Sequence, residues 1–474
     1  MASIVHDFCY EVYVNKIPPN QWITNLIIPV PKKGDLSLMT NYRGITLMSI
    51  CAKVYNKLLL NRIQAIVDRK LRPNQAGFRP ARSCAQQVHI LRRIIEGCTM
   101  KQLPLVATFI DFRKAFDSIN RDSMFKILRS YGIPKAIVDA IRVLYDDSKS
   151  AVLIEGQMSE EFDVTTGVLQ GDVLAPFLFI IVLDFVMLDA QSKNPAGGLV
   201  THPRRSRRHQ DIILNDLDFA DDIGLLESSI PRAQKQLSTT TDSAASVGLM
   251  INTDKTEYLT LNCPTNQHLM VGQIALNRVD DFRYLGSMVV KSLSDFKRRH
   301  GLSWSVFWKL EKIWRSDSVP IHLKIEIFKT TCLSVLLYNC ETWIITKVMA
   351  SMINTFQTRC LRIILGIKRL DRVSNRQIYE TTSSSPLMST VRMRQLKFLG
   401  HILRMQKNEL INIYALYIPP HGKRPPGGQM MSFVNSILKS IDPTGTLTAN
   451  DLIRAAQDKD GWRNLAVACS MTFL

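Results

Sequence analysis

Acidic residues follow or separate apolar stretches of strand length at two places in the chain. Asp111 ends the apolar run Leu105–Ile110, and the adjacent pair Asp221 and Asp222 lies at a turn between two further apolar runs. Carboxylates at the ends of neighbouring strands are held at a fixed separation, and their oxygens are ligands that Mg²⁺ prefers. Each acid alone is equally well explained as a solvated turn residue. Together they indicate a two-metal site for nucleotidyl transfer.

The charge of the chain points to a polyanionic partner. Its 474 residues include 60 Lys and Arg against 41 Asp and Glu, which gives a formal charge of +19 and a pI of about 9.6. Such a surplus favours nucleic acid first and an anionic membrane surface second, with a merely basic protein as the alternative. A hydrophobic content of 46% with 21% charged residues excludes a disordered chain and allows two or three domains.

Cysteines and apolar runs give no sign of secretion or of a membrane span. The nine cysteines form no CxxC pair and no Cys/His cluster, which predicts reduced core thiols in an intracellular protein. The longest apolar run, 173–183, contains Pro176 and is too short to cross a bilayer, so we expect a buried helix there.

Hydrophobic periodicity predicts the elements that must position the acids. We expect the chain to change from mixed α/β to mainly α near residue 290, which gives predicted domains at 1–290, 291–370 and 371–474. The last hundred residues look less regular, with a turn at 422–428. The expected strands are 21–31, 105–110, 257–261 and 282–290, with hairpins at 150–164 and at the Asp-Asp turn. The expected helices are 50–67, 84–97, 122–131, 134–147, 173–190, 231–247, 296–315, 320–338 and 347–365.

Five motifs resemble, in order, the catalytic motifs of reverse transcriptases. They are Phe109–Ser118, Gly167–Pro176, Phe219–Asp222, Gly248–Thr256 and Phe282–Gly286. Upstream, 28–35, 41–45 and 74–79 are similar to the fingers of LINE-type (non-LTR) retrotransposon polymerases, and a weaker echo runs through 338–343 to about 405. The resemblance implies an α+β right-hand polymerase. It would have fingers, a palm with an antiparallel sheet, an α-helical thumb and a mostly α C-terminal extension.

The resemblance assigns the catalytic and primer-binding positions. Asp111 and Asp221 would bind two Mg²⁺ ions with Asp222 as a supporting carboxylate, and Lys255 would protonate the leaving pyrophosphate or merely face solvent. The implied primer grip is Tyr284, Leu285 and Gly286.

The resemblance also assigns the dNTP site. Lys33 and Arg43 would grip the triphosphate; without the motif both would be solvated surface charges. Phe116 would pack under the incoming sugar and exclude a 2′-hydroxyl, or else be a core phenylalanine. Gln170 and Gly171 would shape the turn beneath the template–primer, the alternatives being a surface amide and a simple turn glycine.

Two basic segments are further candidates for nucleic-acid contact. Residues 291–315 carry seven basic side chains and three tryptophans, which resembles a thumb that follows the template–primer backbone. A thumb core covered by solvated charges explains these tryptophans better than base stacking does. The arginine cluster at 204–208 is equally well a solvated loop.

The implied activity is RNA-templated addition of dNTPs to a DNA 3′-end, with an RNA template and a DNA primer as partners and no membrane. One alternative is an RNA-directed RNA polymerase, disfavoured by Phe116 and by the alanine before the paired acids. The other is a catalytically inactive nucleic-acid-binding remnant of a mobile element. The motifs that resemble the polymerase fingers begin near Trp22. We therefore expect a truncated copy of the retrotransposon protein that lacks an upstream endonuclease and cannot nick its target. Nuclear action is implied by resemblance only.

Overall fold

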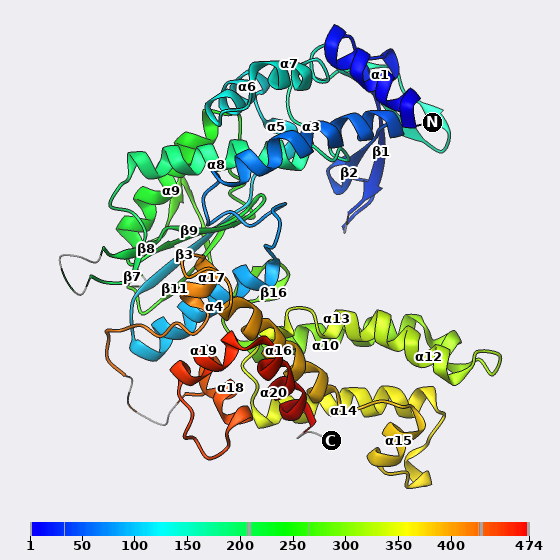
Figure 1. Ribbon diagram of the computed structural model, residues 1–474, viewed down its shortest axis with the longest axis vertical. Coiled ribbons are helices and arrows are strands. Elements are labelled where there is room, and N and C mark those ends of the chain that lie inside the picture. The colour runs from blue at the N-terminus through cyan, green and yellow to red at the C-terminus, as the bar shows by residue number, and fades with distance from the viewer. Residues whose placement is uncertain are drawn as a thin grey trace.

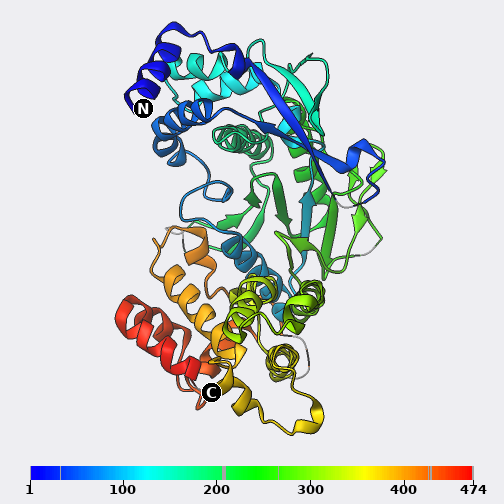
Figure 2. The ribbon, with the colours of Figure 1, turned by 90° about the vertical axis from the view of Figure 1, so that its right-hand side faces the viewer.

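The computed structural model describes residues 2–32, 34–204, 206, 210–264, 266–424, 426 and 430–471. Helices α1 (Ala2–Asn15), α3 (Ile50–Asp68), α6 (Arg121–Ser130) and α7 (Lys135–Arg142) gather at one end of the molecule (Figure 1). A β-sheet region lies in the middle, and the C-terminal helices lie at the opposite end from α1 (Figure 2). The α+β architecture with a largely antiparallel sheet agrees with the expectation.

The central sheet is the element that positions the acids. Its strand order is β14-β11-β3-β10-β9, and all of its pairs are antiparallel except β11–β14. All six residues of its central strand β3 are buried, because helices cover both faces of the sheet. The predicted strands 105–110 and 257–261 and the Asp-Asp hairpin are confirmed. These strands are β3 (Leu105–Ile110), β9 (Asp216–Phe219), β10 (Asp222–Glu227), β11 (Glu257–Leu261) and β14 (Asn277–Arg278).

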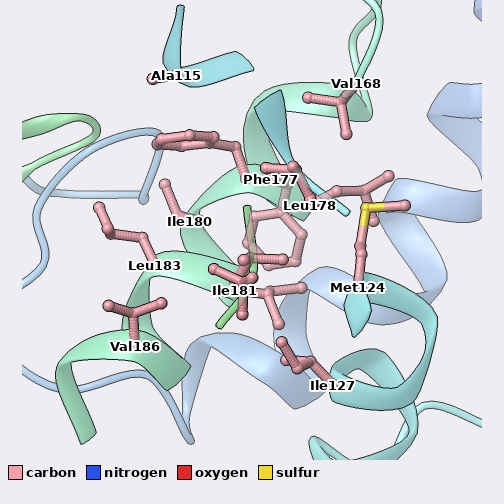
Figure 3. Close-up of a cluster of buried hydrophobic side chains, with 14 of the residues drawn as sticks. Ala115, Met124, Ile127, Val168, Phe177, Leu178, Ile180, Ile181, Leu183 and Val186 are labelled. Atoms are coloured by element: carbon pink, nitrogen blue, oxygen red, sulfur yellow. The ribbon is translucent and has the colours of Figure 1, made fainter. Parts of the chain in front are cut away.

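Helix α8 (Ala175–Lys193) is the core helix on one side of this sheet. Figure 3 shows its side chains, among them Leu178 and Ile181, beside Met124 and Ile127 of α6. Among the described helices it alone is long and apolar enough to cross a bilayer, yet 67% of its apolar window is buried inside the fold. Packing therefore accounts for its apolar length, as the sequence predicted. All nine cysteines are free thiols, and six of them are buried.

A second sheet forms the fingers hairpin. Strands β1 (Thr24–Pro31) and β2 (Tyr42–Leu47) pair antiparallel, and β1 also pairs parallel with β4 (Lys149–Ile154). The predicted strand 21–31 is wrong at its start, because 20–23 form a helical turn that buries Trp22. The other elements in this half are α2 (Asn20–Ile23), η1 (Met39–Asn41), α4 (Cys84–Lys101), α5 (Ala115–Ser118), β5 (Gln157–Met158), β6 (Phe162–Asp163), β7 (Leu199–His202), β8 (Ile212–Leu214), α9 (Ile230–Ala245), β12 (Met270–Val271) and β13 (Ile274–Ala275).

The C-terminal half is helical throughout most of its length, as the expected mostly α extension implies, and the last hundred residues are more regular than the sequence pattern indicated. Apolar side chains of these helices, including Leu396 and Trp462, share one hydrophobic cluster with Phe109 of β3. The predicted helix 320–338 is interrupted by a π-helical turn at 329–333. The helices are α10 (Ser292–Lys309), α11 (Glu311–Arg315), α12 (Ile321–Phe328), α13 (Ser334–Leu336), α14 (Lys347–Ile364), α15 (Asn375–Thr381), α16 (Leu387–Leu403), α17 (Leu410–Tyr414), α18 (Phe433–Ile441), α19 (Ala449–Gln457) and α20 (Lys459–Met471).

Helices on the two sides of the predicted division at residue 370 pack together in one hydrophobic cluster. Helix α14 contributes to a cluster that also contains Leu387 and Val391 of α16, while the second half of α16 packs with the sheet cluster. The predicted domain boundaries stay predictions. The turn predicted at 422–428 lies partly outside the described residues.

A buried arginine joins the fingers to the sheet. Arg72 follows α3, and its guanidinium donates to Asp184 of α8 (3.1 Å) and to Asp216 (2.9 Å) and Asp218 (2.7 Å) of β9. The three aspartate side chains are at most 1% exposed. Tyr131 donates to the second oxygen of Asp184 at 2.6 Å. One cation therefore faces three buried carboxylates, and burial together with the neighbouring Asp216 raises the pKa of Asp218 well above its ordinary value.

We predict that Arg72→Met lowers the free energy of unfolding by about 3 to 5 kcal/mol at neutral pH, because it strands buried carboxylates without their cation. A carboxyl whose pKa is raised in the folded protein stays protonated where the unfolded chain has ionised, so it destabilises the fold as pH rises above its ordinary pKa. Losing Arg72, whose charge lowers the pKa of Asp218, raises that pKa further. The deficit of the variant should therefore grow between about pH 4 and pH 7.

Urea unfolding at several pH values measures this deficit. The matched control is Arg376→Met, at an arginine whose side chain is 89% exposed, with an expected change within about 0.5 kcal/mol. A loss of stability that shrinks with rising pH, or that equals the loss in Arg376→Met, would contradict the role of Arg72 as the cation of the three buried carboxylates.

Candidate active site

The three predicted metal ligands meet at one end of the central sheet. Ile110 of β3 pairs with Ile223 of β10, so the next residues along each strand, Asp111 and Asp222, lie opposite each other. Asp221 belongs to the two-residue turn between β9 and β10, where Ala220 has a φ of +55°. Left-handed backbone at a residue other than glycine is uncommon and persists only where the surroundings hold it.

The electrostatics of these acids fit a cation. Burial, then Asp221 and Asp111, raise the pKa of Asp222 to about 6, while Arg283 lowers it. Burial and Asp111 also raise the pKa of Asp221, which Arg43 lowers. Mutual repulsion among hard oxygen donors is what a divalent ion would relieve. As their side chains stand, the described residues contain no group of three or more His, Cys, Asp or Glu close enough to hold a metal ion.

The segment that carries Lys255 fixes Asp111. Asn252 donates from Nδ2 to Asp111 Oδ2 at 3.1 Å and from its backbone N–H to the Asp111 carbonyl at 2.8 Å. Thr256 Oγ1 accepts from the Asp111 backbone N–H at 3.2 Å. Lys255 Nζ lies 3.9 Å from Asp111 Oδ2 with a side chain that is 70% exposed. The structure thus brings Lys255 beside the first acid, where its ammonium faces the open site.

A fully buried glutamine holds the Asp-Asp turn in place. Gln75 Oε1 accepts from the backbone N–H of Ala220 (2.8 Å) and of Gly77 (2.7 Å), and its Nε2 donates to the Ala220 carbonyl (3.3 Å). A Cβ at Gly77 would lie 2.2 Å from the Ala220 nitrogen. The sequence placed 74–79 in the fingers but assigned these residues no part in holding the turn.

The second motif packs beneath the first. The Phe116 ring is partly buried and stacks on Phe179 of α8, with centroids 4.5 Å apart and planes at 11°. Gln170 Nε2 donates to Asp117 Oδ1 at 3.0 Å, and its carbonyl accepts from Thr46 of β2 at 2.6 Å. Gly171 has a φ of +121°, and a Cβ there would lie 2.3 Å from the Thr46 carbonyl oxygen. Both the backbone conformation and the close approach to the fingers hairpin require glycine.

The predicted triphosphate contacts are only partly described. Arg43 is exposed on β2 opposite Val30, and its charge acts on Asp221. Lys33 lies outside the described residues, as do Arg205, Arg207 and Arg208 of the predicted arginine cluster.

The predicted strand 282–290 is a tight hairpin of two short strands, β15 (Arg283–Tyr284) and β16 (Ser287–Met288). Leu285 and Gly286 form its turn with φ values of +46° and +78°. Tyr284 is only 2% exposed, and its hydroxyl donates to the Leu217 carbonyl at 2.8 Å. Its ring therefore anchors the hairpin, and the exposed Gly286 is the part of the predicted primer grip that faces outward.

The thumb tryptophans differ in burial. Trp314 is 2% exposed and donates to the Phe307 carbonyl at 2.7 Å, whereas Trp308 is 48% exposed and stacks on Trp304. Trp314 therefore belongs to the thumb core, which agrees with the interpretation that these tryptophans are core residues and not platforms for base stacking.

The structure also adds residues that the sequence did not single out. A cleft of about 370 Å³ is lined by Asp111, Asp222 and Lys255 together with Asp254, Glu257 and Arg283. The Arg72 cluster lies at the other end of β9. Asp216 and Asp218 alternate along one strand, so both point to one face. Two acids on one buried face of a strand require a buried cation nearby. This alternation of Asp216 and Asp218 is the sequence signal from which the cluster could have been predicted.

We predict that Gly77→Ala destabilises the protein by about 1 to 3 kcal/mol, because the new methyl group collides with the backbone of the Asp-Asp turn. The control is Gly301→Ala in α10, where nothing lies within 4 Å of the added carbon, and a helical alanine should stabilise by about 0.5 to 1 kcal/mol. Thermal unfolding compares the two. Equal effects of the two variants would mean that the turn tolerates displacement.

Much of the chain is similar in sequence to known proteins. Residues 30–289 match the family described as "Reverse transcriptase (RNA-dependent DNA polymerase)". The chain is 28% identical over 268 residues to the Pol polyprotein of the retrotransposable element R2DM of Drosophila melanogaster, which covers 54% of this chain and 24% of that protein. It is 27% identical over 279 residues to the R2 polyprotein of Popillia japonica, covering 56% of this chain and 38% of that protein.

Two further comparisons concern a second type of mobile element and a solved structure. The RNA-directed DNA polymerase from mobile element jockey of Drosophila funebris is 24% identical, covering 72% of this chain and 38% of that protein. A telomerase structure from Candida albicans aligns at a TM-score of 0.41 and 11% identity, over 86% of this chain and 68% of that one. The chain thus spans about a quarter to two fifths of the retrotransposon proteins that it matches. Because the family match covers more than half of its residues, the chain belongs to the reverse transcriptase family of RNA-dependent DNA polymerases.

Proposed function

We propose that this protein is the RNA-directed DNA polymerase of a non-LTR retrotransposon and adds dNTPs to a DNA 3′-end on an RNA template. The observation that carries this proposal is the meeting of Asp111, Asp221 and Asp222 at one end of adjacent strands. Their pKa values are raised in part by each other. The net charge of +19 supports an RNA template and a DNA primer as partners, and nuclear action belongs to the same proposal.

Enzymes of this family generally use divalent metal ions, and we propose two Mg²⁺ ions here. Asp111 and Asp221 would hold them, with Asp222 in support. When bound, such a pair activates the primer 3′-hydroxyl and neutralises the charge of the leaving pyrophosphate. The contribution of the chain is rigidity, because Asn252 donates to the Asp111 carboxylate and Gln75 accepts from the backbone of the Asp-Asp turn.

The remaining residues bind and orient the nucleotide. Lys255 lies beside Asp111 and is proposed to deliver a proton to pyrophosphate as it leaves. Arg43 and Lys33 are proposed to bind the triphosphate oxygens. Phe116 is proposed to block a 2′-hydroxyl. Its support is the stacking on Phe179 together with the backbone hydrogen bond to Val168 at 2.7 Å, which leave the ring little freedom to move aside.

Primer extension on an RNA template annealed to a DNA primer tests this function. We expect dNTP incorporation that requires Mg²⁺ and falls by at least about 10³-fold in Asp221→Ala, because the variant loses a metal ligand. Asp242→Ala, at an exposed acid on α9 (Ile230–Ala245), should extend like the wild type. Extension with rNTPs alone would favour an RNA polymerase. Absence of extension by a folded protein that binds the template–primer would favour an inactive remnant.

Phe116→Val tests nucleotide selection separately. We expect the ratio of kcat/KM for dNTP over rNTP to fall at least about tenfold, because a smaller side chain makes room for the 2′-hydroxyl. Competition between dNTP and rNTP at one template position measures the ratio. An unchanged ratio with reduced overall activity would assign Phe116 to the core instead.

A further inference from the structure

The segment 338–343 has no part in the function proposed above, although its sequence stood out. It follows α13 and contains a 3₁₀ turn at 340–342. Figure 1 shows α13 next to α10, at the start of the helical half and near β16. The contacts of this segment show whether it only fills the thumb core or also supports the β15–β16 hairpin.

Tyr338 contacts the Leu285–Gly286 turn directly. Its hydroxyl donates to the Leu285 carbonyl at 3.3 Å. Its ring edge lies 3.7 Å from the position of a Cβ at Gly286. The Arg299 guanidinium covers one face of the ring at 4.5 Å from the centroid, and Arg299 also donates to the Gly286 carbonyl at 2.5 Å. Both carbonyls of the turn are therefore held from this side.

The rest of the segment fixes Tyr338 in position. Asn339 donates to Ser287 Oγ at 3.2 Å on the second strand of the hairpin. Trp343 is fully buried and donates to Asp295 Oδ2 at 2.8 Å. Asp295 in turn accepts from the Met288 backbone N–H at 3.1 Å. The hairpin, the segment and the first turn of α10 thus form one hydrogen-bonded unit around a buried aspartate.

Tyr338 differs from Trp343 in that it stays 39% exposed. A residue that served only the thumb core would be covered, as Trp343 is. The hairpin that Tyr338 contacts borders the cleft of the catalytic acids, because Arg283 and Tyr284 line that cleft together with Asp111 and Asp222. The Tyr338 ring is therefore partly open to solvent and contacts a hairpin that borders the active-site cleft.

We propose that Tyr338 is a positioning residue for the primer terminus and acts by holding the Leu285–Gly286 turn in its left-handed conformation toward the catalytic acids. This inference rests on the proposed function, since it assumes that a primer 3′-end lies against that turn. The primer must approach within near-attack distance of the nucleotide, so a small shift of the turn affects the rate more than it affects nucleotide binding.

The test uses the full chain with Tyr338→Phe, which keeps the ring, and Tyr338→Ala, which removes it. Single-turnover extension should slow about fivefold in Tyr338→Phe, the effect of one neutral hydrogen bond, and about 30-fold or more in Tyr338→Ala, where ring support is also lost. The KM for dNTP should stay within about twofold in both variants, because the triphosphate contacts are untouched. The matched controls are Tyr10→Phe and Tyr10→Ala, at a 60% exposed tyrosine on α1, and they should extend like the wild type.

A second readout does not need turnover. A primer with 2-aminopurine as its 3′-terminal base, annealed to the RNA template, reports its placement by fluorescence when the protein binds. Tyr338→Ala should change this signal at saturating protein while Tyr10→Ala does not.

Rates and fluorescence equal to the wild type in both Tyr338 variants would overturn the inference, as would a parallel loss of dNTP affinity and rate. If Tyr338→Ala fails to fold, Tyr338→Phe decides. If the wild type binds the primer but does not extend it, the proposed function fails and the fluorescence comparison still decides the inference. If the wild type does not bind the primer, both fail.

Discussion

The buried contact between Arg72 and three aspartates is the constraint on which the site depends. Asp184 comes from the core helix α8, while Asp216 and Asp218 come from the strand that leads into the Asp-Asp turn. Three carboxylates cannot stay ionised together in a core without a cation. Arg72 therefore fixes the start of the fingers segment 74–79 against β9. The same segment then supplies Gln75, whose side chain pairs with the Asp-Asp turn.

At the site, a rigid buried sheet carries acids that repel one another. Buried on both faces, β3 cannot shift without exposing apolar area, and it carries Asp111 to the end of the sheet. The acids meet there with raised pKa values because burial and mutual repulsion act together. Repulsion of this kind is tolerated where the fold holds the backbone from several sides. Here Asn252, Thr256 and Gln75 do so from two different segments.

A second buried hub connects the palm to the thumb. Asp295 accepts from Arg92 at 2.9 Å, from Trp343 and from the backbone of Met288. Through these contacts the start of α10, helix α4 (Cys84–Lys101) and the β15–β16 hairpin become one unit. Buried hydrogen bonds therefore connect the sheet to the helical half, and the β15–β16 hairpin is supported from the side of α10.

The sequence by itself determined the family and most of the elements. Acids after apolar runs indicated the sheet end, the order of the five motifs identified the family, and periodicity located α3, α4, α8 and β3 because each buries one face or both. Tertiary structure alone decided which elements cover those faces. Periodicity says that a face is buried but not by what, so the packing of the C-terminal helices on the sheet escaped prediction. The same limit applies to Tyr284, whose ring is turned inward to Leu217, and to Arg72, whose three partners lie 112 to 146 positions away.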